Sequence, residues 1–141
     1  MTSFGPIDVD DGLPGSNRLY RNTGTSFVEI AQAAGVNQAS PVESDAFGAA
    51  FGDYDLDGDL DLFVASWKHE SDGNRLVRND TVDGVIQFTD VTDDAMPDNI
   101  LGAHGFQPAF CDMNGDCYPE ILLAADHETS RYYMNLSLIH I

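Results

Sequence analysis

The sequence has very little positive charge. Its 141 residues include only six lysines and arginines against 24 aspartates and glutamates, which gives a formal net charge of −18 at pH 7. Such a surface repels the phosphates of nucleic acids and of anionic lipids, so we expect neither as a partner. The same excess of carboxylates favours the binding of cations. A hydrophobic fraction of 43% is close to the globular average, which argues against a wholly disordered chain.

Long apolar runs are also missing. No segment approaches the ~18 consecutive apolar residues that a membrane-spanning helix needs, so we expect no membrane insertion. Residues 1–8 show no basic start followed by an apolar stretch, which is the pattern of a signal peptide. The sequence contains no His-Glu-x-x-His zinc motif, no Gly-x-Ser-x-Gly motif and no phosphate-binding glycine loop. We therefore predict that the chain is not an enzyme.

Acidic residues are concentrated in one short segment. Five aspartates occupy alternate positions: Asp53, Asp55, Asp57, Asp59 and Asp61. Like charges a few ångströms apart cost on the order of 1 kcal/mol each even in high dielectric, so a cluster of this kind is typical of a cation site. Ca²⁺ suits it, because this ion takes roughly six to eight oxygen ligands in irregular geometry. We predict that Asp59 binds through its backbone carbonyl and the other four through their carboxylates. A solvated acidic turn is the alternative.

The residues around this segment predict strands rather than helices. Gly58 permits a tight turn, because glycine reaches positive φ without steric cost. A helix–loop–helix calcium sensor begins with a similar string but requires a glutamate at the twelfth position and a helix after it. That position is Val64, and residues 62–67 are rich in β-branched and aromatic side chains. The predicted order is therefore a strand, a calcium loop and a second strand.

This unit occurs a second time. Residues 110–124 align with residues 51–65 without a gap. The second loop has oxygen donors at the equivalent positions: Asp112, Asn114, Asp116, Tyr118 (through its carbonyl) and Glu120. Because an amide here replaces one of the carboxylates, we predict tighter calcium binding at the first loop.

Other segments repeat at the same period of about 60 residues. Residues 17–22, 74–79 and 130–135 form one series, and residues 27–31 and 88–92 form another. Four short strands per repeat predict an all-β fold, a fragment of a β-propeller with antiparallel four-stranded blades, of which about two are present; a β-solenoid is the alternative. We predict a partial blade in residues 17–31, a full blade in 44–92 and a partial blade in 105–135, with an inter-blade loop at 92–102.

Residues 51–62, 74–79 and 130–135 resemble a known family. The chain is similar to the FG-GAP/VCBS repeat proteins, whose repeats also build integrin α-subunit heads, and in particular to the cartilage acidic protein-like branch associated with ASPIC/UnbV domains. The resemblance spans residues 5–135. It implies a propeller of about seven or eight blades, structural Ca²⁺ in the blade loops, an extracellular, periplasmic or cell-surface location, and adhesion or the binding of a protein or glycan ligand. The alternative is a propeller scaffold of a polysaccharide lyase or similar enzyme, with catalytic residues outside this segment.

The second loop departs from this pattern at two positions. Cys111 and Cys117 replace the glycines that stand at positions 52 and 58 of the first loop, and they are the only cysteines in the chain. A disulfide across the loop and two independent thiols are both compatible with this spacing. A disulfide would fit an extracytoplasmic compartment.

Residues 136–141 break the repeat. Their string, Leu-Ser-Leu-Ile-His-Ile, is the translation of CTG TCT CTT ATA CAC ATC, which resembles a transposon-end adaptor used in sequencing libraries. We expect an artefactual, adaptor-derived tail here, with a genuine apolar strand as the alternative. Residues 1–135 then form the partial propeller domain.

Overall fold

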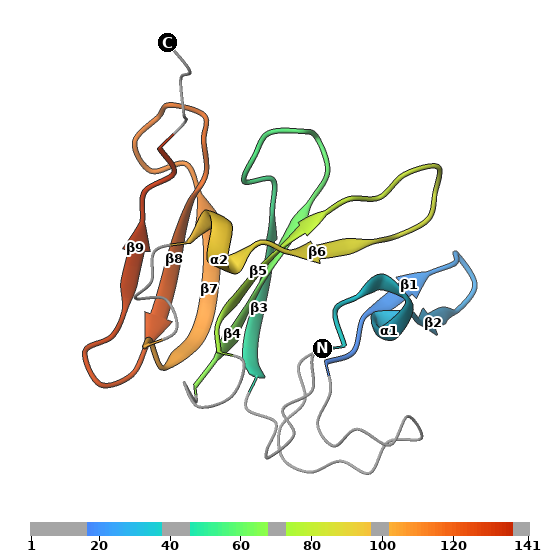
Figure 1. The fold of residues 1–141 in the computed structure, drawn as a ribbon, viewed down its shortest axis with the longest axis horizontal. Helices are drawn as coiled ribbons and strands as arrows, with labels where there is room; N and C mark the ends of the chain where they lie inside the picture. Colours follow the sequence, from blue (N-terminus) through green and yellow to red (C-terminus); the bar gives the residue numbers. More distant parts are fainter. Residues whose placement is uncertain (1–16, 38–45, 68–72, 97–101, 137–141) are drawn as a thin grey trace.

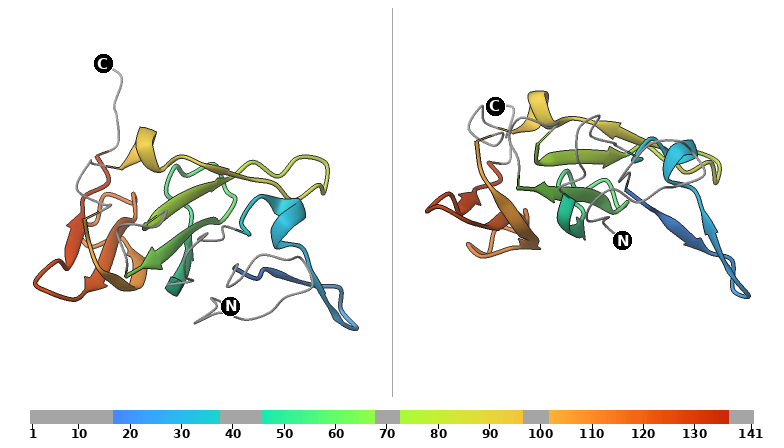
Figure 2. Two further views of the ribbon diagram at one scale, coloured as in Figure 1. Left: turned by 60° about the horizontal axis from the view of Figure 1, so that its bottom comes forward. Right: turned by 90° about the horizontal axis from the view of Figure 1, so that it is seen from below.

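The computed structural model describes residues 17–37, 46–67, 73–96 and 102–136 (Figure 1). Within these ranges the chain folds into three small antiparallel sheets of two, four and three strands, in the order of the sequence. Figure 2 shows that the four-stranded sheet lies between the other two. The chain is thus all-β and has the arrangement of a β-propeller fragment, as the repeats predicted. The last residues of the expected adaptor-derived tail, 137–141, lie outside the described residues.

The sheets are connected by hairpins and two short helices. The first sheet contains β1 (Tyr20–Asn22) and β2 (Phe27–Glu29), and α1 (Ala31–Ala34) follows it. The second contains β3 (Ala46–Gly52), β4 (Asp61–Ser66), β5 (Arg75–Asn79) and β6 (Phe88–Asp90), and α2 (Thr92–Ala95) follows it. The third contains β7 (Gly105–Cys111), β8 (Glu120–Ala125) and β9 (Arg131–Tyr133). The prediction of a loop from residue 92 was wrong over α2, a single helical turn that has no side-chain cap.

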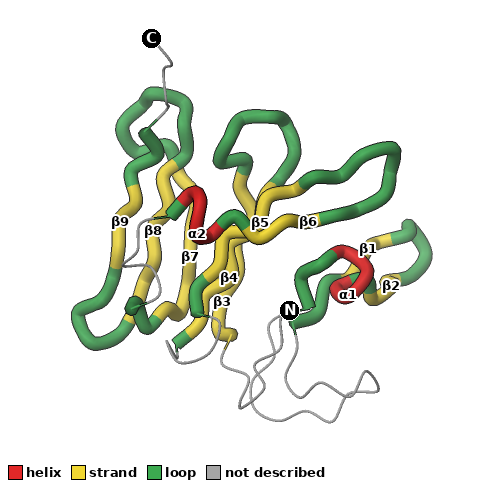
Figure 3. Tube along the Cα trace, viewed as in Figure 1, coloured by secondary structure: helices red, strands yellow, loops and turns green. Residues whose placement is uncertain are grey.

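The two acidic loops close equivalent hairpins. In the β3–β4 hairpin the last strand pair before the loop is Gly52 with Asp61, and in the β7–β8 hairpin it is Cys111 with Glu120. Each hairpin also has one irregularity near its opposite end, at Ala46/Gly48 and at Gly105/Gln107. The two copies of the sequence repeat therefore pair their strands in the same register. Both loops extend from the same end of their sheets (Figure 3).

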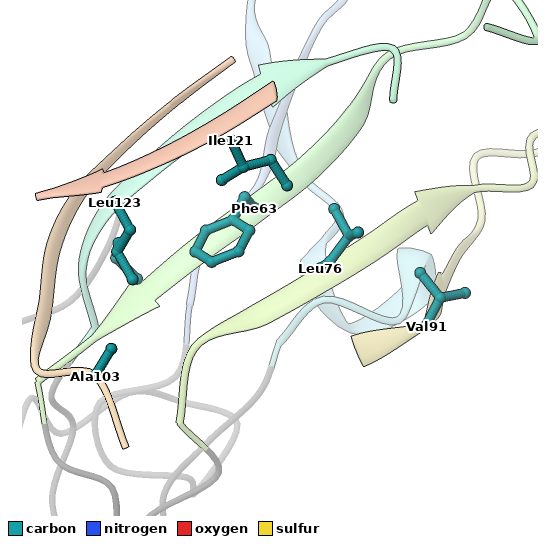
Figure 4. Packing of buried hydrophobic residues seen from close by; sticks show 7 residues of the cluster. Phe63, Leu76, Val91, Ala103, Ile121 and Leu123 are labelled. Atoms are coloured by element: carbon teal, nitrogen blue, oxygen red, sulfur yellow. The ribbon is translucent and has the colours of Figure 1, made fainter. Parts of the chain in front are cut away.

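β4 lies in the centre of the molecule, and all six of its residues are buried. Leu62 and Val64 pack toward α1, in one apolar cluster with Ala31 and Ala34. Phe63 belongs to a second apolar cluster, which includes Ile121 and Leu123 of the third sheet (Figure 4). Because both faces of β4 are covered, its sequence is a continuous apolar run rather than an alternating one.

Neighbouring sheets are also joined by polar contacts. The buried Asn74 accepts the backbone N–H of Ser66 through Oδ1 at 3.0 Å and donates from Nδ2 to the carbonyl oxygen of Ala103 at 2.7 Å. Gly105 lies so close to Asn74 that a Cβ atom would collide with its side chain. The asparagine that opens the repeated Asn-Arg segment thus connects β5 to the segment leading into the third sheet. No helix in the described residues has the length and apolar character needed to cross a membrane.

Candidate metal centre

Three carboxylates of the first loop converge. Asp53, Asp55 and Asp61 each place an oxygen within 4.8 Å of the other two. Asp53 directly follows β3, Asp55 lies in the exposed loop, and Asp61 is the buried first residue of β4. The hairpin therefore brings together side chains that are up to eight positions apart in the sequence. An all-oxygen donor set of this kind fits a hard divalent cation such as Ca²⁺.

The carboxylate of Asp61 is held in place by two backbone hydrogen bonds. Its Oδ2 accepts the backbone N–H of Tyr54 and its Oδ1 accepts that of Asn79, each at 2.9 Å. Burial nevertheless raises the pKa of Asp61, and the charges of Asp55 and Asp57 add to this, against the lowering effect of the two hydrogen bonds. A buried carboxylate whose negative charge is disfavoured can be stabilised by a neighbouring cation.

Asp53 shapes the turn. Its two carboxylate oxygens accept the backbone N–H groups of Asp57 and Gly58, both at 3.1 Å. Gly58 has a φ of +97°, the positive-φ conformation expected from the sequence. Asp57 accepts the N–H of Asp59 at 2.9 Å and is not one of the three convergent residues. The structure thus brings together three of the four carboxylates predicted as ligands.

Burial and neighbouring charge act together on Asp55. Partial burial raises the pKa of this carboxyl, and the charge of Asp57 raises it further. The Asp53 charge acts in the same direction, whereas a backbone hydrogen bond and Arg78 lower the pKa. The net effect is an upward shift of the Asp55 pKa, with burial as its largest cause and the neighbouring carboxylates as a smaller one.

The second loop has similar backbone bonds and a different centre. Asp112 accepts the N–H groups of Gly115 at 2.8 Å and Cys117 at 3.0 Å; the second bond corresponds to that from Gly58 to Asp53, and the first comes from one position earlier than in the first loop. The amide nitrogen of Asn114 donates to Glu120 at 2.9 Å and to Asp116 at 3.1 Å. A neutral donor thus bridges two carboxylates there.

The remaining groups of the second loop are also engaged. Glu120 is fully buried and accepts the backbone N–H of Met113 at 2.7 Å. Tyr118, predicted to offer its carbonyl, donates its N–H to Asp116 at 2.9 Å. Within the described residues, the carboxylates of this loop do not form a convergent group of three like that of the first loop.

The two cysteines of the second loop are free thiols, and both are exposed. The sequence left open a disulfide or two independent thiols, and the structure shows two independent thiols. Cys117 has a φ of +73°, so it adopts the backbone conformation that Gly58 adopts in the first loop. A residue with a Cβ atom is strained in this region.

The sequence did not reveal that the first loop contacts the next sheet. Asn135 donates from Nδ2 to the carbonyl oxygen of Tyr54 at 2.7 Å and to that of Pro119 at 3.3 Å. Tyr54 is the same residue whose N–H is held by Asp61. The equivalent Asn79 donates to the carbonyl oxygen of Leu60 at 3.0 Å, which corresponds to the bond from Asn135 to Pro119. The one sequence feature that could have indicated this contact is the asparagine that ends each of the repeated segments 17–22, 74–79 and 130–135.

Comparison with known proteins agrees with the repeat seen in sequence and structure. The family model described as FG-GAP-like repeat matches residues 9–64 and again residues 53–123. No curated protein gives a significant match. The second match starts at Asp53, the first carboxylate of the convergent group. Since the two matches together cover most of the sequence, the chain belongs to the FG-GAP-like repeat family.

Proposed function

We propose that this chain is a calcium-binding repeat module that serves adhesion or the binding of a protein or glycan ligand outside the cytoplasm. The observation that supports it is the convergence of Asp53, Asp55 and Asp61 within 4.8 Å. FG-GAP-like repeats are characteristic of binding modules rather than catalytic ones, which is consistent with this role. We further propose that the chain belongs to the cartilage acidic protein-like branch of the family.

In the first loop, Asp53, Asp55 and Asp61 would hold the ion, with Asp57 and the carbonyl of Asp59 as further oxygen donors. In the second loop the proposed ligands are Asp112, Asn114, Asp116, Glu120 and the carbonyl of Tyr118. A bound Ca²⁺ would offset the repulsion and the burial that raise the pKa values of Asp55 and Asp61. The convergence of Asp53, Asp55 and Asp61 favours the first loop as the tighter site.

The ion would have a structural role. Asp61 holds the N–H of Tyr54, and the carbonyl oxygen of Tyr54 accepts a hydrogen bond from Asn135 after β9. A cation that fixes Asp61 and the loop around Tyr54 therefore stabilises the contact between the second and third sheets. This arrangement would make the rigidity of the module depend on the calcium concentration of its surroundings.

Thermal unfolding with and without calcium tests the proposal. A ligand present at 100 times its Kd stabilises the native state by about 2.7 kcal/mol, so millimolar Ca²⁺ is expected to raise Tm clearly above its value in chelator. Mg²⁺ at the same concentration is the control, because it demands a stricter octahedral geometry and should raise Tm less. Equal Tm values in calcium and in chelator, for a chain that unfolds cooperatively, would refute a structural calcium site.

A further inference from the structure

Two histidines and a tryptophan from different segments meet away from the acidic loops. Trp67 follows β4, His104 lies just before β7, and His127 lies in the turn between β8 and β9, so all three stand at the strand ends opposite to those loops (Figure 1). The centroids of the two imidazole rings are 5.2 Å apart. The indole centroid is 5.3 Å from that of His104 and 6.1 Å from that of His127. The cluster therefore joins the segment after β4 of the second sheet to two segments of the third.

The ring of His104 is oriented by a backbone carbonyl group. Its Nδ1 lies 2.6 Å from the carbonyl oxygen of Trp67. Because a carbonyl oxygen only accepts hydrogen bonds, we assign the proton of this bond to Nδ1. In the neutral ring the lone pair is then on Nε2, the nitrogen that can bind a metal ion. Histidine ligands usually donate their other ring N–H to a carbonyl or carboxylate group in this way, since that bond fixes the tautomer and the orientation of the ring.

The turn that contains His127 is bonded to the segment of His104. The N–H of Asp126 donates to the carbonyl oxygen of His104 at 2.9 Å, and the N–H of His104 donates to Oγ1 of Thr129 at 3.0 Å. Within the turn, His127 and Glu128 have φ values of +50° and +61°. This region is unfavourable for residues with a Cβ atom, and such strain is concentrated at functional sites. The backbone bonds thus fix the positions of the two imidazole-bearing segments relative to each other.

The surroundings of the two rings favour a cation. Oδ2 of Asp126 lies 3.9 Å from Nε2 of His127, and the whole chain has a formal net charge of −18. Imidazole nitrogen suits divalent transition metals such as Zn²⁺, Ni²⁺ and Cu²⁺, whereas Ca²⁺ prefers oxygen ligands. Nε1 of Trp67 is buried and has no hydrogen-bond partner. The indole N–H can only donate, so it needs an acceptor such as the oxygen of a metal-bound water.

We propose that His104 and His127 bind a divalent transition-metal ion such as Zn²⁺, at the junction of the second and third sheets. His104 binds the ion through Nε2. Among the described residues the two imidazoles are the protein ligands, because Asp126 does not converge with them into a group of three. Water completes the coordination, as it does at zinc sites that keep an open position, and one such water accepts the N–H of Trp67. This inference does not depend on the calcium sites, which lie at the other end of the strands and use oxygen donors.

The fluorescence of Trp67 tests the proposal, because this residue is the only tryptophan in the chain. Ni²⁺ quenches indole fluorescence at short range. With Ca²⁺ present in excess to occupy oxygen-donor sites, Ni²⁺ should quench Trp67 with a saturable one-to-one curve, and Zn²⁺ should compete and restore the emission. His127→Gln should weaken the binding of both ions about tenfold or more. The side chain of His127 is exposed, so this change is expected to leave the fold intact.

Two controls separate this site from other metal-binding groups. His140→Gln removes a histidine that the proposal does not use and should leave the quenching curve unchanged. The exposed thiols can also bind such ions, but Cys111 ends β7 whereas His104 precedes it, so the double change Cys111→Ser and Cys117→Ser should have no effect either. Quenching that persists unchanged in His127→Gln, or that the double change abolishes, would overturn the proposal. Quenching that rises linearly without saturation would also overturn it, since it would reflect collisions and not a site.

Discussion

The two acidic loops have the same backbone design and different centres. In both, the first aspartate holds two backbone N–H groups and the last acid is a buried residue at the start of a strand. The first loop then brings three carboxylates together, whereas the second places the amide nitrogen of Asn114 between Glu120 and Asp116. In the second loop a neutral amide thus supplies a hydrogen-bond donor to two carboxylates, whereas in the first loop we propose that a cation takes this place.

The largest expected effect concerns the buried acids. Asp61→Ala removes the acceptor of two backbone N–H groups, those of Tyr54 and Asn79. Each buried unsatisfied group costs about 1–3 kcal/mol, so we expect a loss of roughly 3 kcal/mol in the free energy of unfolding. The matched variant Glu120→Ala frees one backbone N–H, that of Met113, and the side-chain amide of Asn114; it should lose less, because Asn114 is exposed and its amide can bond water. Urea titrations in chelator measure the free energy of unfolding of both variants. A larger loss for Glu120→Ala than for Asp61→Ala would contradict this ranking.

Removing one converging charge should separate affinity from stability. Asp55→Asn takes a carboxylate out of the group, so we expect calcium affinity to fall about tenfold or more. Without calcium the same variant should be slightly more stable, because burial and Asp57 raise the pKa of Asp55 and so disfavour its charge. Calorimetric titration and urea unfolding measure the two effects. Asp116→Asn in the second loop is the control and should leave the first site intact.

The reciprocal change should make the second loop resemble the first. Asn114→Asp replaces the bridging amide with a fourth carboxylate near Glu120 and Asp116. We expect calcium affinity at this loop to rise and the metal-free stability to fall, since a donor is exchanged for a like charge. A variant that loses stability without gaining affinity would show that the amide is not what distinguishes the two loops.

The raised pKa values predict a pH dependence of definite sign. Because the folded-state pKa of Asp55 lies above its unfolded value, its ionisation destabilises the metal-free fold above that pKa. This penalty disappears as the pH falls through the folded pKa toward the unfolded one. In metal-free buffer, the stability advantage of Asp55→Asn over the unchanged chain should therefore shrink as the pH falls from 7. With calcium the trend differs, because protons compete with the ion and affinity falls. An advantage that grows in acid would contradict the assignment.

The smallest expected effect is the strain at Cys117. Its φ of +73° is unfavourable for a residue with a Cβ, so Cys117→Gly should stabilise the chain by about 1 kcal/mol. Gly58→Ala, at a φ of +97° with open space around the position of a Cβ, should destabilise it by a similar amount. Chemical denaturation under reducing conditions compares the pair. Equal stabilities of the chain and its Cys117→Gly variant would show that the second loop relaxes around the cysteine.

Much of the fold could be predicted because the repeat is visible in the residues themselves. The alternating aspartates with Gly58 define the first loop, and the gapless match of residues 110–124 to residues 51–65 defines the second. The one-turn helix α2 was missed because no side-chain cap marks its start. Spacing alone could not decide whether Cys111 and Cys117 are bonded, since six positions fix no distance.

The details of the candidate site were harder to predict. The spacing suggests four convergent carboxylates, yet Asp57 accepts the N–H of Asp59 and is not in the group of three. Asn114 was expected to offer an oxygen, but its Nδ2 is what meets the two acids. Side-chain orientation depends on local hydrogen bonds that residue type does not determine.

Isothermal titration of calcium into the chain and into the variants Asp53→Ala and Asp112→Ala tests the central claim most directly. Both aspartates hold two backbone N–H groups of their own loop, so the two changes are matched in structural cost. The convergent group in the first loop predicts that Asp53→Ala removes the tighter binding, while Asp112→Ala leaves it in place. Greater loss of affinity in Asp112→Ala than in Asp53→Ala would contradict it.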